Sequence, residues 1–174
     1  MQFAKDSFFL ALQSRLAGLN PARTITMNGA TVPAIVVVEN LPPSSAEQAA
    51  NAFYIEWGAT SVVDGHSGSG ALMSMECVIS YYTFGTVASR VDRGRVLGQL
   101  DDELLAICQP PSTEKRDYAQ APSADLGTRV FWSQPRFSEN AKSGVENQAE
   151  RHADGRVERK AGITVFFFSE VTLS

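Results

Sequence analysis

The sequence predicts an α+β fold: a mainly antiparallel β-sheet with a long β-hairpin, and two main helices packed on the sheet. Two long segments of alternating apolar and polar residues, 53–64 and 71–86, flank the Gly/Ser-rich stretch 65–70 and predict the hairpin. Two other segments repeat apolar residues at helical spacing. A chain of 174 residues is long enough for one domain with its own core, and no internal repeat or linker divides it. We therefore expect a single domain over 1–174.

The chain opens with an amphipathic helix. Its apolar side chains recur at three- and four-residue intervals, at Phe8, Phe9, Leu12, Leu16 and Leu19. Gly18 and Pro21 predict its end.

Two strands, 24–27 and 30–39, follow this helix. They flank Asn28-Gly29, the dipeptide best suited to a tight hairpin turn. The run 35–38 is apolar on both faces, which predicts a central strand covered on two sides. Pro33 lacks an amide donor and predicts a bulge or a partly free edge nearby.

A short helix is expected next, through about residue 52. Ser45 and Gln48 have the spacing of a capping box. This helix would lead directly into the long hairpin.

The long hairpin has two different faces, because successive strand side chains alternate. One face is apolar and comprises Phe53, Ile55, Trp57, Ala59, Val63, Met73, Met75, Cys77, Ile79 and Tyr81. The other is mixed and comprises Tyr54, Glu56, Thr60, Asp64, Leu72, Ser74, Glu76, Val78, Ser80 and Tyr82. The mixed face is too apolar for open water and too polar for a core. We expect it to meet another element or another subunit.

The second main helix is predicted over 91–108. Ser89 and Asp92 can cap it, and Pro110-Pro111 ends it. Its apolar stripe comprises Val96, Leu97, Leu100, Leu104 and Ile107.

The remaining chain predicts a loop through Tyr118 and Pro122, a short strand at 128–132, a long polar arm at about 135–160, and an interior strand over 162–173. The arm contains almost no apolar residue, so we expect it to be mobile or to bind something.

Composition excludes several classes of partner. The formal net charge of -4 leaves no broad basic surface for nucleic acid. No apolar stretch approaches membrane-spanning length, and the N-terminal residues lack a secretion-signal pattern, so we expect no membrane and a reducing setting. Cys77 and Cys108 could pair in principle, but they match no metal spacing, and two buried free thiols are favoured.

No motif predicts a catalytic residue, a cofactor site or a metal site. The stretch 65–70 resembles a phosphate loop only in composition, and His66 and Ser67 are adjacent rather than facing each other. The acidic run 101–103 lies on a helix whose consecutive side chains fan outward, which favours a solvated face over a metal site. His152 lies among basic residues, which favours a surface position.

Three arginines at the start of the second helix, Arg90, Arg93 and Arg95, lie where the helix dipole disfavours positive charge. They could pair locally with Asp92 or Asp101, or form salt bridges across a subunit contact. Trp57 and Trp132 are expected to be core anchors or interface hot spots. The candidate subunit or partner interface comprises Trp57, Tyr54, Glu56, Val62, Leu72, Val78, Tyr82, Arg90, Arg93, Arg95, Arg151 and Arg156.

The order of these elements resembles a known family. The opening helix, the strand 33–38, the long hairpin, the helix segment 93–104 and the closing pieces 117–118, 127–132 and 162–166 are together similar to the tail terminator proteins of long-tailed bacteriophages. The similarity is one of pattern over nearly the whole chain and includes no catalytic signature.

This resemblance implies a structural virion protein, not an enzyme. Members of that family form a ring, expected here to be a hexamer, on the last ring of tail tube protein. The ring stops tube polymerisation and provides the attachment surface for the neck or connector, and DNA passes through the lumen without specific binding. The chain would be assembled in the host cytoplasm and reside at the head-proximal end of the virion tail, with the 135–160 arm as a docking element. Alternatives are another neck, head-completion or minor tail protein and, in another class, a small hydrolase or ligand-binding domain.

Overall fold

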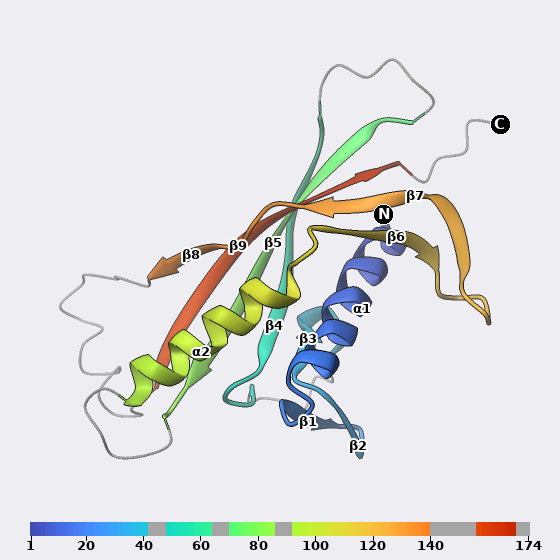
Figure 1. Cartoon of the computed structure of the whole chain (residues 1–174). Coiled ribbons are helices and arrows are strands. Elements are labelled where there is room, and N and C mark those ends of the chain that lie inside the picture. The colour runs from blue at the N-terminus through green and yellow to red at the C-terminus, as the bar shows by residue number, and fades with distance from the viewer. Residues whose placement is uncertain (42–47, 64–69, 86–91, 140–155, 170–174) are drawn as a thin grey trace.

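The computed structural model describes residues 1–41, 48–63, 70–85, 92–139 and 156–169 (Figure 1). Helices α1 (Gln2–Leu19) and α2 (Asp92–Ile107) pack on a mostly antiparallel sheet, which confirms the α+β prediction. The strands are β1 (Thr24–Met27), β2 (Ala30–Pro33), β3 (Ile35–Val37), β4 (Phe53–Val62), β5 (Leu72–Thr83), β6 (Ser112–Asp117), β7 (Ala124–Trp132), β8 (Arg136–Glu139) and β9 (Val157–Phe168). A single 3-10 turn, Val38–Asn40, follows β3. Within the described residues, no helix is long and apolar enough to cross a membrane.

The main sheet has the order β3-β4-β5-β9-β7-β6, and β8 pairs with β9 beside β7. Every pairing is antiparallel except β3 with β4. The predicted long hairpin is confirmed as β4 and β5, and β5 pairs with β9 along its whole length. The predicted faces of β4 hold only as far as Trp57, because a register shift between Trp57 and Thr60 places Thr60, expected on the mixed face, opposite Met75 of the apolar face. Strand β9 is interior, as predicted. Figure 1 shows the strands fanning apart toward the two ends of the sheet.

The core lies between the helices and one face of the sheet. The apolar stripes of α1 and α2 meet the predicted apolar face of the hairpin, because 3.6-residue and two-residue periods both bring apolar side chains to one side. Fully or nearly fully buried members include Phe8, Leu12, Leu100, Leu104, Met75, Cys77, Ile79 and Tyr81. We call this the helix face of the sheet and the opposite side the outer face.

The predicted strand 30–39 is divided in two. It breaks after Pro33, and β1 and β2 form a separate two-stranded sheet around Asn28, whose φ of 50° fits the predicted turn. Strand β3 is an edge strand rather than the central strand expected. It is nevertheless buried on both faces, because Ile35 and Val37 join the main core while Val36 packs in a second cluster with Ile25 and Met27 of the small sheet.

The described part of the expected helix ending near residue 52 is not helical. Residues 48–52 form a turn, in which Asn51 has a φ of 60° and donates its backbone N–H to the Tyr82 carbonyl. The Ala49 N–H donates to the Tyr54 hydroxyl at 2.5 Å. These partners replace the hydrogen bonds that a helix would supply. Ser45 lies outside the described residues.

The second half of the chain contains more strand than the sequence predicted. Residues 112–117, expected in a loop, form β6, and β7 begins four residues earlier than its predicted start. The polar arm is also shorter than 135–160, because β8 occupies 136–139 and β9 begins at Val157. Both mistakes have one cause: these strands carry many charged residues, and polar strands lack the apolar alternation that predicts a strand.

Candidate subunit interface

An aromatic patch lies on the outer face, where no helix of the described chain packs. Phe166 is directly opposite Phe131 on β7, and Phe168 is directly opposite Leu72 on β5. The intervening Phe167 is 1% exposed in the core, so its neighbours Phe166 and Phe168 point the other way. Phe131 is 41% exposed and the other three are partly exposed. We call Leu72, Phe131, Phe166 and Phe168 the aromatic patch.

Three members of this patch were missed by sequence reasoning. The run 165–168 is apolar at every position, so its sequence alone does not show that one of its two faces is left uncovered. The paired residues on β5 distinguish the covered face from the uncovered one. Phe166 and Phe168 lie opposite Ser74 and Leu72, whereas Val165 and Phe167 lie opposite Met75 and Met73. The predicted member Leu72 belongs to the patch.

The distal part of the hairpin is the second exposed apolar feature. Strand β3 pairs with β4 only as far as Ile55, so beyond that residue β4 is the edge of the sheet. The predicted interface residues Glu56 and Val62 lie here and are exposed, Val62 by 59%. Val78, opposite Glu56, is half-buried on the outer face.

Two predicted interface tyrosines belong instead to the subunit's own fold. Tyr54 is 3% exposed and Tyr82 is 7% exposed. The Tyr82 hydroxyl donates to the Gln48 carbonyl, and burial raises the pKa of Tyr54 above its usual value. Their polar tips are used to hold the 48–52 turn, so this part of the mixed hairpin face does meet another element, within the same chain.

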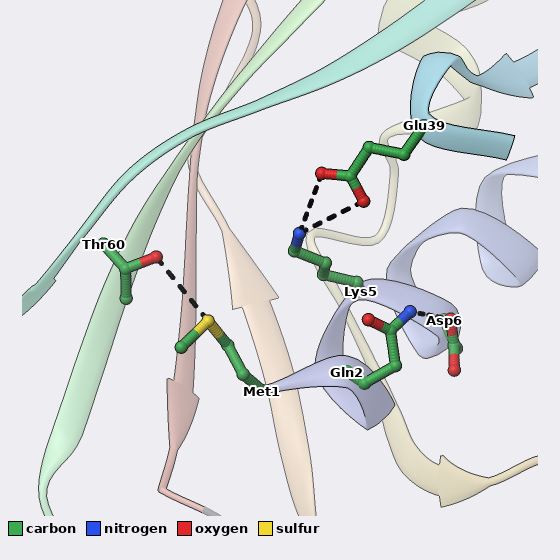
Figure 2. A network of polar contacts seen from close by, with 6 residues as sticks. All are labelled: Met1, Gln2, Lys5, Asp6, Glu39 and Thr60. Carbon is green, nitrogen blue, oxygen red and sulfur yellow. Dashed lines mark hydrogen bonds and ion pairs between the residues drawn. The ribbon is translucent and has the colours of Figure 1, made fainter.

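Trp57 packs against the core and remains partly exposed. Its ring meets Phe8 edge-to-face at 5.6 Å, and the Lys5 ammonium lies 5.4 Å from the ring centroid. Figure 2 shows the Lys5 side chain extending from the first turns of α1 to Glu39, with which it pairs at 3.2 Å. In the same view the Thr60 hydroxyl approaches the Met1 sulfur. These contacts fasten the beginning of α1 to β4. The second predicted anchor, Trp132, is 4% exposed in the core.

Of the arginines at the start of α2, the two that the structure describes, Arg93 and Arg95, do not pair with Asp101. Arg93 and Arg95 are exposed, and Arg90 and Arg151 lie outside the described residues. Asp101 instead accepts a hydrogen bond from the Tyr81 hydroxyl at 2.5 Å and forms an ion pair with Arg159. These bonds join α2 to β5 and β9.

The prediction of a solvated face for 101–103 was wrong at two of its three positions. The side chain of Asp101 is 14% exposed and that of Glu103 is 16% exposed, while Asp102 is exposed. Glu103 pairs with Arg23 at 2.6 Å and accepts from the Asn20 amide at 2.7 Å. Asp101 and Glu103 therefore join α2 to neighbouring elements of the fold. The spacing of acidic residues in the sequence does not predict these contacts.

Arg156 lies at the opposite end of β9 from the aromatic patch. It pairs with Glu158 at 3.0 Å, and its guanidinium lies 4.5 Å from the centroid of the Tyr82 ring. Arg156 is exposed, so this cation could also face a partner.

The described residues contain no group of three His, Cys, Asp or Glu side chains that could hold a metal ion. The stretch 65–69, with His66 and Ser67, and His152 lie outside the described residues. Cys77 and Cys108 are free and buried, as expected, and burial raises the pKa of Cys108 to about 12. Because such thiols stay protonated, they are poor nucleophiles.

No protein-family model matches the chain, and no curated protein matches it. A chain of a solved structure described as the virion of a native gene transfer agent particle is similar to it at 14% identity, with a TM-score of 0.39. That similarity covers 95% of this chain and 98% of the other. A TM-score of this size assigns neither a family nor a function.

Proposed function

We propose that the chain is a structural protein of a phage-type virion that caps the tail tube as a homo-oligomeric ring. In this role it stops tube polymerisation and offers the attachment surface for the head or neck. The observation that carries the proposal is the aromatic patch on the uncovered outer face. The resemblance of the element order to tail terminator proteins supplies the specific role.

The patch is suited to a protein partner. Exposed contiguous apolar side chains on a folded subunit mark contact surfaces, and aromatic residues are enriched in them. Fully burying one Leu or Phe side chain contributes about 1.5–3 kcal/mol, so completing the burial of four partly exposed ones contributes several kcal/mol before the entropic cost of association. A structural role needs such surfaces and no reactive group.

The test is to add the purified chain to polymerising tail tube protein from the same particle and to measure tube lengths by electron microscopy. We expect short tubes with a ring at one end, and overlong or headless tails in particles assembled without the protein. Phe131→Asp places a charge in the patch and should abolish capping. Leu105→Asp is the matched control, because Leu105 is 37% exposed on α2, away from the patch.

The outcomes separate the alternatives. A ring that leaves tube length unchanged would favour a neck, head-completion or minor tail protein. A strict monomer that binds no virion protein would overturn the proposal and favour a hydrolase or ligand-binding domain.

A further inference from the structure

The sheet ends in two unpaired edges on opposite sides. Strand β4 has no strand partner on its outer side beyond Ile55, and β8 has none on the side away from β9, within the described residues. An unpaired edge presents a row of backbone donors and acceptors that readily pairs with another strand. Beyond the register shift between Trp57 and Thr60, the end of β4, residues 60–62, contains no charged residue and no proline that would block such pairing.

Each edge carries a charged side chain of the sign that the other edge can pair with. At the β4 edge, Glu56 is exposed, and the Glu76 carboxylate reaches across Gly58, because an added Cβ on Gly58 would lie 3.4 Å from Glu76 Oε2. At the β8 edge, Arg136 is exposed. It lies opposite Gly162, which lies opposite Val78, which in turn lies opposite Glu56, so Arg136 and Glu56 are on the same outer face of the sheet. Arg136 on one edge can therefore pair with Glu56 or Glu76 on the other edge of a second copy, although β8 as a whole carries one basic and one acidic residue, Arg136 and Glu139.

The strand directions also agree. Strand β9 runs antiparallel to β5 and to β8, and β4 runs antiparallel to β5, so β8 runs antiparallel to β4. A second copy that continues the sheet in the same orientation would thus place its β8 antiparallel to the first copy's β4. Antiparallel neighbours need no crossover connection and form regular hydrogen-bond ladders.

The two edges are offset along the strands. One row of paired residues across the sheet runs from Phe137 of β8 through Ala161 and Ile79 to Ile55 of β4. Thr60 lies five residues farther along β4, a distance of roughly 15 Å at the usual strand rise. A closed sheet requires such a stagger, because strands tilt relative to the axis about which the sheet closes.

We infer that copies of this chain join head-to-tail by antiparallel pairing of the distal edge of β4 with β8 of the next copy. This head-to-tail seam uses two different surfaces on each subunit, as a cyclic ring requires. The inference deepens the proposed function and rests on it, because it assigns the subunit contact of the proposed ring. It leaves the aromatic patch free for a different virion protein.

The test is disulfide cross-linking of the full chain. Ser138→Cys on β8 is combined in turn with Glu56→Cys, Ala59→Cys and Ser61→Cys, which scan the β4 edge. Directly opposite residues of an antiparallel pair lie about 4.5–5.5 Å apart between Cα atoms, within the span of a disulfide. The native cysteines are buried, so they give little background. At least one combination should yield a denaturant-resistant ladder of subunit multiples that ends at the ring size.

Each single cysteine variant should give no ladder beyond a dimer. The matched control combines Ser61→Cys with Gln120→Cys, an exposed position in the turn between β6 and β7, and should give no ladder either. Circular dichroism of the reduced proteins checks that the variants fold.

The results distinguish the seam from the function. No ladder from any of the three combinations, with a solution mass that still equals a ring, would overturn the head-to-tail seam but leave the proposed function standing. A monomeric mass without cross-linking would overturn both. Arg136→Glu provides a second measurement: it should raise the concentration at half-assembly about tenfold or more, and Glu76→Arg in the same chain should restore most of the loss. An unchanged midpoint in Arg136→Glu would contradict the assigned charge pairing.

Discussion

Arg15 is expected to be one of the largest polar contributors to the stability of the subunit. Its guanidinium donates from Nη1 to the Ile107 carbonyl at 2.9 Å and the Pro110 carbonyl at 2.8 Å, and from Nη2 to the Ser112 carbonyl at 3.0 Å. It also lies 5.2 Å from the centroid of the Trp132 ring. One side chain on α1 thereby fixes the end of α2, the prolines that follow it and the start of β6.

The loss on replacing Arg15 with Met follows from these contacts. Two of the three hydrogen bonds are partly buried and one is exposed. A partly buried hydrogen bond from a charged donor contributes about 1.5 kcal/mol, the exposed one about 0.5 kcal/mol, and the ring contact about 0.5 kcal/mol. Because Met keeps most of the apolar packing, we expect Arg15→Met to lower the free energy of unfolding by about 3–4 kcal/mol. Arg15→Lys keeps the charge but not the fork of donors and should lose about 2 kcal/mol.

Urea unfolding followed by circular dichroism measures this directly, and the melting temperature of Arg15→Met should fall by roughly 10 °C. Arg95→Met is the control, because Arg95 is exposed on α2 and its replacement should change stability by less than about 0.5 kcal/mol. A loss below about 1 kcal/mol in Arg15→Met would refute the reasoning, since it would mean that water replaces the guanidinium at all three carbonyls.

Three further measurements test the interior. Burial and the hydrogen bond to Asp101 raise the pKa of Tyr81, so the folded state keeps this proton above the unfolded pKa near 10, and the free energy of unfolding should fall as pH rises beyond that value. In urea unfolding between pH 9.5 and 11, Tyr81→Phe should reduce the dependence of the unfolding free energy on pH by up to about 1.4 kcal/mol per pH unit. Gly98→Ala should stabilise the protein by about 0.5–1 kcal/mol, because nothing lies within 4 Å of the added Cβ. Gly58→Ala should destabilise it by about 1 kcal/mol, because the added Cβ would lie 3.0 Å from the Glu76 Cβ, and equal melting temperatures for the two variants would contradict both expectations. The thiol of Cys108 should react with a disulfide reagent at pH 8 only at the rate of unfolding, and fast labelling of the native protein would show that the site opens locally.

Sequence reasoning succeeded where apolar periodicity is strong. The stripe of α1, the stripe of α2, the alternation of β5 and that of β4 as far as Trp57 each identify the element and the face that it buries, because a single hydrophobic core imposes both. Beyond Trp57 the alternation of β4 gave the wrong face, because a bulge shifts the register. Sequence reasoning failed where backbone pairing, not apolar burial, makes the strand. Lys115 on β6 illustrates this: it is 3% exposed, yet its ammonium donates to the Phe168 carbonyl, a partner that no local pattern indicates.

The candidate interface was harder to predict than the fold. Alternation shows that Tyr82 and Leu72 share one face of β5, but not that the 48–52 turn covers the first while the second stays partly open. Which part of a face is covered depends on contacts between segments far apart in the chain. The mixed face of the hairpin was predicted to meet another element or another subunit. Tyr54 and Tyr82 meet another element of the same chain, whereas the distal residues of this face stay open in the subunit.

The fold covers some edges of its sheet with other elements and leaves others uncovered. The β6 edge is closed by α1, because the Ser7 hydroxyl accepts from the Arg116 backbone N–H at 3.0 Å. The β3 edge strand is short, and its two faces are covered by the β1–β2 sheet on one side and α1 on the other. The distal β4 edge and the β8 edge have no such cover within the described residues. The two edges left open are opposite in position and run antiparallel to each other, which is the arrangement that the proposed head-to-tail pairing between copies requires.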